Sequence, residues 1–126
     1  MNLEKVVFGF FILLAATLNF GFVYGDVDVP AHHNEWELFA AVFVNLIAAV
    51  LKFGDRTHIG AVHLASSLVA ILQLATATVV WILAAGGDTP LASGTMAGIV
   101  SLAAGALLAN IVSIVIMVVE TTMQRR

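Results

Sequence analysis

The sequence contains no cysteine and few charged side chains. Without thiols the chain can form no disulfide, no thiolate metal site and no cysteine nucleophile. Charged residues make up 10% of the chain and hydrophobic residues 61%, and the mean hydropathy is +1.05. Soluble domains carry about a quarter charged residues. The composition therefore excludes an ordinary soluble domain, and the chain has no basic patch for a nucleic acid.

Four long stretches are almost free of charge and occupy most of the chain. A transmembrane helix needs about 20 apolar residues, because the hydrocarbon core is about 30 Å thick. We predict an all-α fold, an integral membrane bundle of four transmembrane helices that makes residues 1–126 a single membrane domain. A cleaved signal peptide is the alternative for the first stretch, but its apolar run continues to Tyr24, which is too long for one. The predicted spans are residues 6–24, 35–53, 58–85 and 90–119.

All lysines and arginines fall on one side of these spans. They lie at the N-terminus, between the second and third spans, and at the C-terminus, whereas the other two connections carry only acidic residues and histidines. The positive-inside rule then places the N- and C-termini in the cytoplasm. The basic residues are Lys5, Lys52, Arg56, Arg125 and Arg126.

Local signals mark the ends of the spans. Asn34 precedes the second span as a helix N-cap, Gly54-Asp55 ends it, and Thr89-Pro90 opens the fourth span. The second span is short, since residues 38–51 cover only about 21 Å at a helical rise of 1.5 Å per residue. We therefore expect Glu37 and Lys52 at the hydrocarbon boundary.

Each predicted span carries one carboxamide side chain, and the third also carries a histidine about one turn from its start. A buried amide without a partner destabilises a membrane helix, so these groups are expected to face protein or water rather than lipid. They either fix the register of the helices, as a buried Asn does in a coiled coil, or line a hydrated path. No carboxylate lies deep in a span, which disfavours a carboxylate proton relay. The residues of this candidate polar seam are Asn19, Asn45, Gln73, Asn110 and His63.

Small residues recur along one face of the fourth span, at intervals of four, three, four, four and four residues. Helices in lipid associate through close backbone approach, so this spacing predicts a packing ridge, within the chain or between copies. The ridge consists of Gly94, Gly98, Ser101, Gly105, Ala109 and Ser113.

No enzyme, cofactor or metal site is predicted. His32 and His33 lie among acidic residues, but adjacent histidines do not readily bind one ion, and no zinc-binding spacing occurs. A single chain offers no facing histidine pair for haem, since only His63 is embedded. Nucleophile–base pairs and glycine-rich phosphate loops are also missing from the sequence.

Five segments carry a resemblance to a known family: Met1–Lys5, Leu18–Gly21, Pro30–His33, Leu51–Thr57 and Ala106–Asn110. Through these segments the chain resembles a family of short bacterial inner-membrane proteins classed as a domain of unknown function. The resemblance implies a four-span, multi-pass protein of the bacterial inner (cytoplasmic) membrane, and it brings no activity or ligand.

These observations together predict a non-enzymatic membrane protein that acts in, or supports, the transport of a small ion. Its expected partners are the lipid bilayer and either further copies of itself or another membrane protein. The alternative is a structural or accessory subunit of a larger membrane complex, with no transport path of its own.

Overall fold

The computed structural model describes residues 3–55, 57–85 and 91–124, which form four α-helices and one short 3-10 helix. The all-α prediction is confirmed for these residues. The elements are α1 (Leu3–Val23), η1 (Pro30–His32), α2 (Glu35–Lys52), α3 (His58–Ala84) and α4 (Ser93–Gln124).

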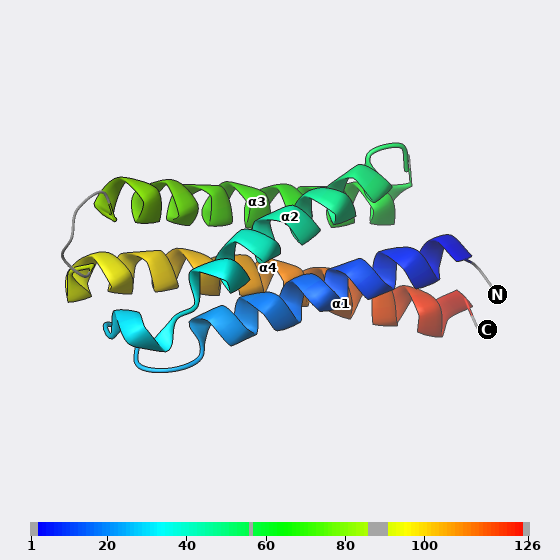
Figure 1. Ribbon diagram of the computed structural model, residues 1–126. Coiled ribbons are helices and arrows are strands. Elements are labelled where there is room, and N and C mark those ends of the chain that lie inside the picture. Colours follow the sequence, from blue (N-terminus) through cyan, green and yellow to red (C-terminus); the bar gives the residue numbers. More distant parts are fainter. Residues whose placement is uncertain (1–2, 56, 86–90, 125–126) are drawn as a thin grey trace.

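The four α-helices run side by side along the length of the molecule (Figure 1). One end, called here the termini end, holds the start of α1, the turn between α2 and α3, and the end of α4. The opposite end, the loop end, holds the connection from α1 to α2, the end of α3 and the start of α4. Each helix packs against two neighbours, in the order α1, α2, α3, α4 and back to α1. The four helices therefore surround one common axis.

Short hydrogen-bonded turns set the starts of α2 and α3. The side chain of Asn34 accepts from the Trp36 backbone N–H at 2.9 Å, which confirms the predicted N-cap of α2. At α3, the Thr57 hydroxyl accepts from the Gly60 N–H at 2.9 Å, and it donates to the Asp55 carboxylate at 2.7 Å. The predicted cap of the fourth span, Thr89-Pro90, lies outside the described residues.

Three of the described helices, α1, α3 and α4, are long and apolar enough to cross a membrane. The remaining helix, α2, has 18 residues and carries Glu35, Glu37 and Lys52. All four helices nevertheless present large apolar side chains on the outside of the bundle, an arrangement typical of a surface that faces lipid. Examples, one from each helix, are Phe10, Phe43, Leu72 and Leu108.

Buried apolar side chains form two clusters. The larger one contains Phe22, Leu38, Trp81 and Met96, and it joins all four helices. The smaller one is centred on Phe8 near the start of α1. Trp81 is buried with its ring centroid 6.0 Å from that of Phe22, so it belongs to the core.

Candidate functional site

Six polar side chains are buried inside the bundle, and all four helices contribute to the set, called here the polar column. Each has at most 2% of its surface exposed. Among the described residues, eight of their side-chain nitrogen and oxygen atoms have no hydrogen-bond partner. Buried polar groups are normally paired, so this concentration singles out the column. Its members are Asn19, Asn45, His63, Ser67, Asn110 and Ser113.

Contacts at the termini end fix the relative heights of the helices. The Lys52 ammonium lies 4.4 Å from the centroid of the Phe8 ring, and that centroid lies 4.8 Å from the centroid of His63. These three residues, on α2, α1 and α3, therefore share one level. An ion pair between Lys5 and Glu120, 2.8 Å long, places α4 in the same register. We refer to the height of Phe8 as the base level.

The helical rise of 1.5 Å per residue then orders the column along the bundle axis. Ser67 and Ser113 lie about 6 Å from the base level, and Asn45 and Asn110 lie about 10 Å from it. Asn19 lies about 16 Å from the base level. The column therefore extends from the termini end through about half of a hydrocarbon core that is about 30 Å thick.

Apolar side chains close the column toward the loop end. Phe22, Leu38, Trp81 and Met96 all lie about 20 Å or more from the base level by the same reckoning. All are buried in the larger apolar cluster. The larger apolar cluster therefore covers the column on this side, and the smaller cluster around Phe8 lies at its base on the side of the termini end.

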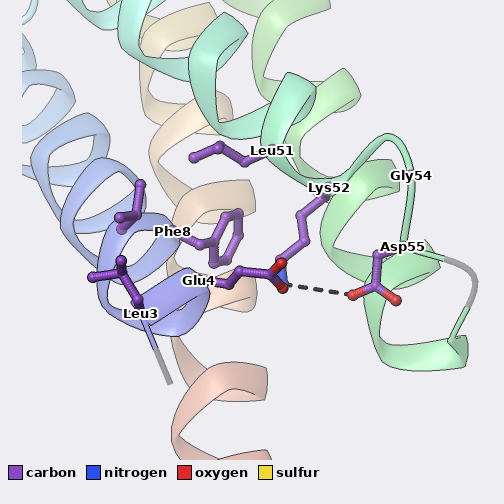
Figure 2. Close-up of a pocket in the computed structure, with 8 residues that line it drawn as sticks. Leu3, Glu4, Phe8, Leu51, Lys52, Gly54 and Asp55 are labelled. Carbon is purple, nitrogen blue, oxygen red and sulfur yellow. Dashed lines mark ion pairs between the residues drawn. The ribbon is translucent and has the colours of Figure 1, made fainter. Parts of the chain in front are cut away.

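A cavity of about 550 Å³ lies at the termini end, between the start of α1 and the turn after α2. Phe8 and Lys52 line it, and Figure 2 shows them beside Asp55, which pairs with Lys52. Because Phe8 also contacts His63, the Phe8 and Lys52 side chains stand between the cavity and the base of the column. The remaining lining residues are Leu3, Glu4, Val7, Leu51 and Gly54.

Charges gather around this cavity and the column base. The Lys52 ammonium lies 3.6 Å from the carboxylate of Asp55. The charges of Lys52, Asp55 and Glu120 all lie near enough to His63 to interact with it electrostatically. Hydrogen bonds from the Thr57 backbone N–H and hydroxyl hold the pKa of Asp55 below its usual range, and Lys52 acts in the same direction. Asp55 is therefore an anion at neutral pH, and its charge offsets that of Lys52.

The structure separates Gln73 from the other carboxamides. Asn19, Asn45 and Asn110 are fully buried, whereas Gln73 is half-buried and its carboxamide lies against Gly105, where α3 meets α4. Asn45 donates through Nδ2 to the backbone oxygen of Ala41 on its own helix, at 2.7 Å. Its Oδ1 is left without a donor.

The predicted boundary charges contact α1, and the predicted small-residue ridge lies only partly inside the bundle. Glu37 places its carboxylate against Gly21 of α1, and Lys52 lies over Phe8 as described above. The ridge of α4 is divided between two environments. Gly105, Ala109 and Ser113 are buried or half-buried, whereas Gly94, Gly98 and Ser101 are exposed.

Sequence reasoning did not find the roles of Ser67 and His33. Ser67 follows His63 by four residues and so shares its helical face, which was the available signal.

His33 is buried, with Nδ1 2.5 Å from the Phe22 carbonyl oxygen and Nε2 2.8 Å from the carbonyl oxygen of Asp26. His33 thereby fastens the connection after α1 to the end of that helix.

No group of three or more potential metal ligands occurs among residues 3–55, 57–85 and 91–124. The adjacent histidines differ in role, because His32 is exposed and accepts from the Asp26 backbone N–H at 3.0 Å.

A model described as a family of unknown function (DUF6394) matches residues 32–121, a range that includes every member of the polar column except Asn19. No curated protein and no solved structure matches the chain significantly.

Proposed function

The chain belongs to the family of unknown function DUF6394, and we propose that it is a four-span protein of the bacterial inner membrane that takes part in transporting a small ion. The polar column is the route by which water and the ion reach the interior of the bundle from the termini end.

The register between α1 and α2 supports α2 as the fourth span. Glu37 lies against Gly21, and Lys52 lies over Phe8. Between these two contacts α1 rises about 20 Å and α2 about 22 Å. The charged ends of α2 therefore lie level with Phe8 and Gly21 of α1, and this supports the placement of α2 in the same bilayer as α1. The lipid-facing side of α2 is apolar, with Phe43 63% and Val50 72% exposed.

Charge supports cytoplasmic termini. Lys5 and Lys52 lie at the termini end, and Arg56, Arg125 and Arg126 adjoin it in sequence, whereas the connection between α1 and α2 contains no lysine or arginine. By the positive-inside rule the termini end faces the cytoplasm. In a His32→Cys variant of this cysteine-free chain, an impermeant thiol reagent should label the new thiol only from the periplasmic side. Labelling only from the cytoplasmic side would reverse the orientation.

The observation that carries the transport proposal is the set of eight unpartnered polar atoms inside a bundle whose exterior is apolar. A buried polar group left without a partner destabilises the fold by about 1–3 kcal/mol. Water admitted from the termini end supplies the missing partners, since buried waters make about three hydrogen bonds each. A helix-register role would instead pair the amides with one another, and no such pair occurs among the described residues.

Self-association is part of the same proposal. Gly94 and Gly98 are exposed on α4, and a Cβ added at either would meet nothing within 4 Å inside the chain. Glycine on a lipid-facing side lets a second helix approach closely. We therefore assign this face to a further copy of the chain or to another membrane protein. The second candidate function, an accessory subunit without its own transport path, uses the same face.

Ion flux in liposomes tests the proposal. The full chain, reconstituted into vesicles, should carry Na⁺, K⁺ or H⁺ above the leak of empty vesicles. Asn45→Leu should abolish the flux, and Leu46→Ala, the lipid-facing neighbour on the same helix, should not. Vesicles that match empty controls for all three ions would refute transport and favour the accessory role.

A further inference from the structure

We propose that the carboxamide oxygens of Asn19, Asn45 and Asn110 form a coordination site for one monovalent metal cation at the inner end of the polar column. The inference rests on the proposed function and names the ion class. Its starting observation is that all three Oδ1 atoms belong to fully buried residues and lack any hydrogen-bond donor.

Asn45 defines the polarity of the site. Its Nδ2 donates to the Ala41 carbonyl oxygen at 2.7 Å, and a carbonyl can only accept, so nitrogen and oxygen cannot be exchanged. The group therefore presents Oδ1, an acceptor only, to the interior. Such an atom is satisfied by a donor or by a cation.

The direction of the helices brings the three carboxamides together. Cα–Cβ bonds tilt toward the N-terminus of an α-helix. The N-terminus of α1 lies at the termini end, so Asn19 leans toward that end, whereas α2 and α4 run the other way and Asn45 and Asn110 lean toward the loop end. The tilts reduce the separation of about 6 Å between the two levels of backbone. Three helices thus contribute one carboxamide each to a common region of the axis. Asn19 and Asn110 have neither a donor for Oδ1 nor an acceptor for Nδ2, so their amides are free to turn the oxygen toward an ion.

The ligand chemistry selects the ion. All three oxygens are neutral, and no acidic residue lies in α1 between Lys5 and Asp26 or in α4 before Glu120. Calcium is bound largely by carboxylates, and magnesium keeps most of its waters and one or two carboxylates. Neutral carbonyl oxygens are instead the ligands that replace the hydration shell of K⁺ in channel filters. An alkali cation, with water completing its shell, fits this set.

The surrounding side chains agree with a small, partly hydrated ion. Ser67 and Ser113 carry unpartnered hydroxyl oxygens about 4 Å nearer the base level than Asn45 and Asn110, on the side from which the ion would arrive. Beyond Asn19 the apolar cluster around Phe22 excludes water. The site therefore lies where the hydrated part of the column ends.

Thermal unfolding of the full chain in detergent tests the site. Ionic strength is held constant with choline chloride while NaCl, KCl or LiCl replaces it, and Tm is followed by circular dichroism. A ligand that binds only the folded state stabilises it in a saturable way. We expect one of these cations to raise Tm by several degrees with saturation, and Asn45→Leu to abolish the rise. Leu46→Ala should keep it.

Three outcomes would overturn the site. Equal Tm values in all four chlorides would show that the column holds only water. If Tm rises when gluconate replaces chloride, but not when one cation replaces another, the column holds an anion site. An unchanged rise in Asn45→Leu would place the cation elsewhere.

The liposome experiment separates this inference from the proposed function. Flux without a cation-dependent Tm would leave transport standing and remove the site. A cation-dependent Tm that Asn45→Leu abolishes, with no flux in vesicles, would leave the site standing and remove transport.

Discussion

Two glycines on one helix, Gly105 and Gly98, should respond in opposite ways to the same substitution. A Cβ at Gly105 would collide with the carboxamide of Gln73, whereas a Cβ at Gly98 would meet nothing within 4 Å. Gly105→Leu must displace the Gln73 carboxamide and also place its own side chain where α3 meets α4, and overpacking of this kind destabilises a fold by about 1–3 kcal/mol. Gly98→Leu removes a residue whose helix propensity is about 0.8–1 kcal/mol worse than that of alanine. It should leave the stability of the single chain unchanged or raise it.

Both stability and size are measured for this pair. Thermal unfolding in detergent reports the first, and size-exclusion chromatography with light scattering reports the second. Gly105→Leu should lower Tm, and Gly98→Leu should keep Tm but reduce the oligomer if the exposed glycines contact a second copy. The reasoning is refuted if Gly105→Leu unfolds at the wild-type temperature or if Gly98→Leu is the less stable of the two.

Three further changes test contacts at the two ends of the bundle. His33→Phe leaves the carbonyl oxygens of Phe22 and Asp26 without their hydrogen-bond partner. We therefore expect the free energy of unfolding to fall by about 1–3 kcal/mol and backbone hydrogen exchange to become faster in the connection after α1. Unchanged exchange there would contradict the role of His33. Glu120→Gln weakens the ion pair with Lys5 and should lower stability by about 1 kcal/mol or less, an effect that high salt should reduce. Because the folded-state pKa of Asp55 is depressed, its contribution is present at neutral pH and is lost as the pH falls below about 4. Asp55→Ala should therefore have a lower Tm than wild type at pH 7 and a much smaller difference at pH 3. Asp55→Asn, which keeps the acceptor for Thr57, should lose less Tm at pH 7. An equal loss of Tm in Asp55→Ala at both pH values would refute the stabilising role of the Asp55 carboxylate.

The order and extent of the helices could be predicted because charge and capping residues interrupt the apolar stretches at few places. Asn34 caps α2 as its side chain predicts, and Asp55 closes the turn before α3. Both signals are local, so they survive in the folded chain. The short length of α2 could also be predicted from its flanking residues. Among the four described α-helices, α2 is the one that is not long and apolar enough to cross a membrane by length and composition alone.

Which face of each helix lies inside was harder to predict. In a membrane bundle lipid and core are both apolar, so the hydrophobic pattern does not distinguish them, and only polar residues indicate the rotation of a helix. On α3 that rotation buries Ser67, leaves the adjacent Ser66 only half-buried, and turns Gln73 toward Gly105. The exposed outer half of the ridge on α4 and the burial of Trp81 follow from the same tertiary packing, which no local signal encodes.

Cysteine accessibility tests most directly whether water reaches the polar column from the termini end. The chain has no cysteine, so Ser67→Cys introduces a single thiol of nearly the original size inside the column. Ala77→Cys is the matched control, buried on the same helix about 15 Å nearer the loop end. In vesicles, a small charged methanethiosulfonate reagent should modify Ser67→Cys from the side of the termini only and leave Ala77→Cys unmodified. A Ser67→Cys variant that stays unmodified from both sides, in protein that remains folded, would contradict a hydrated column.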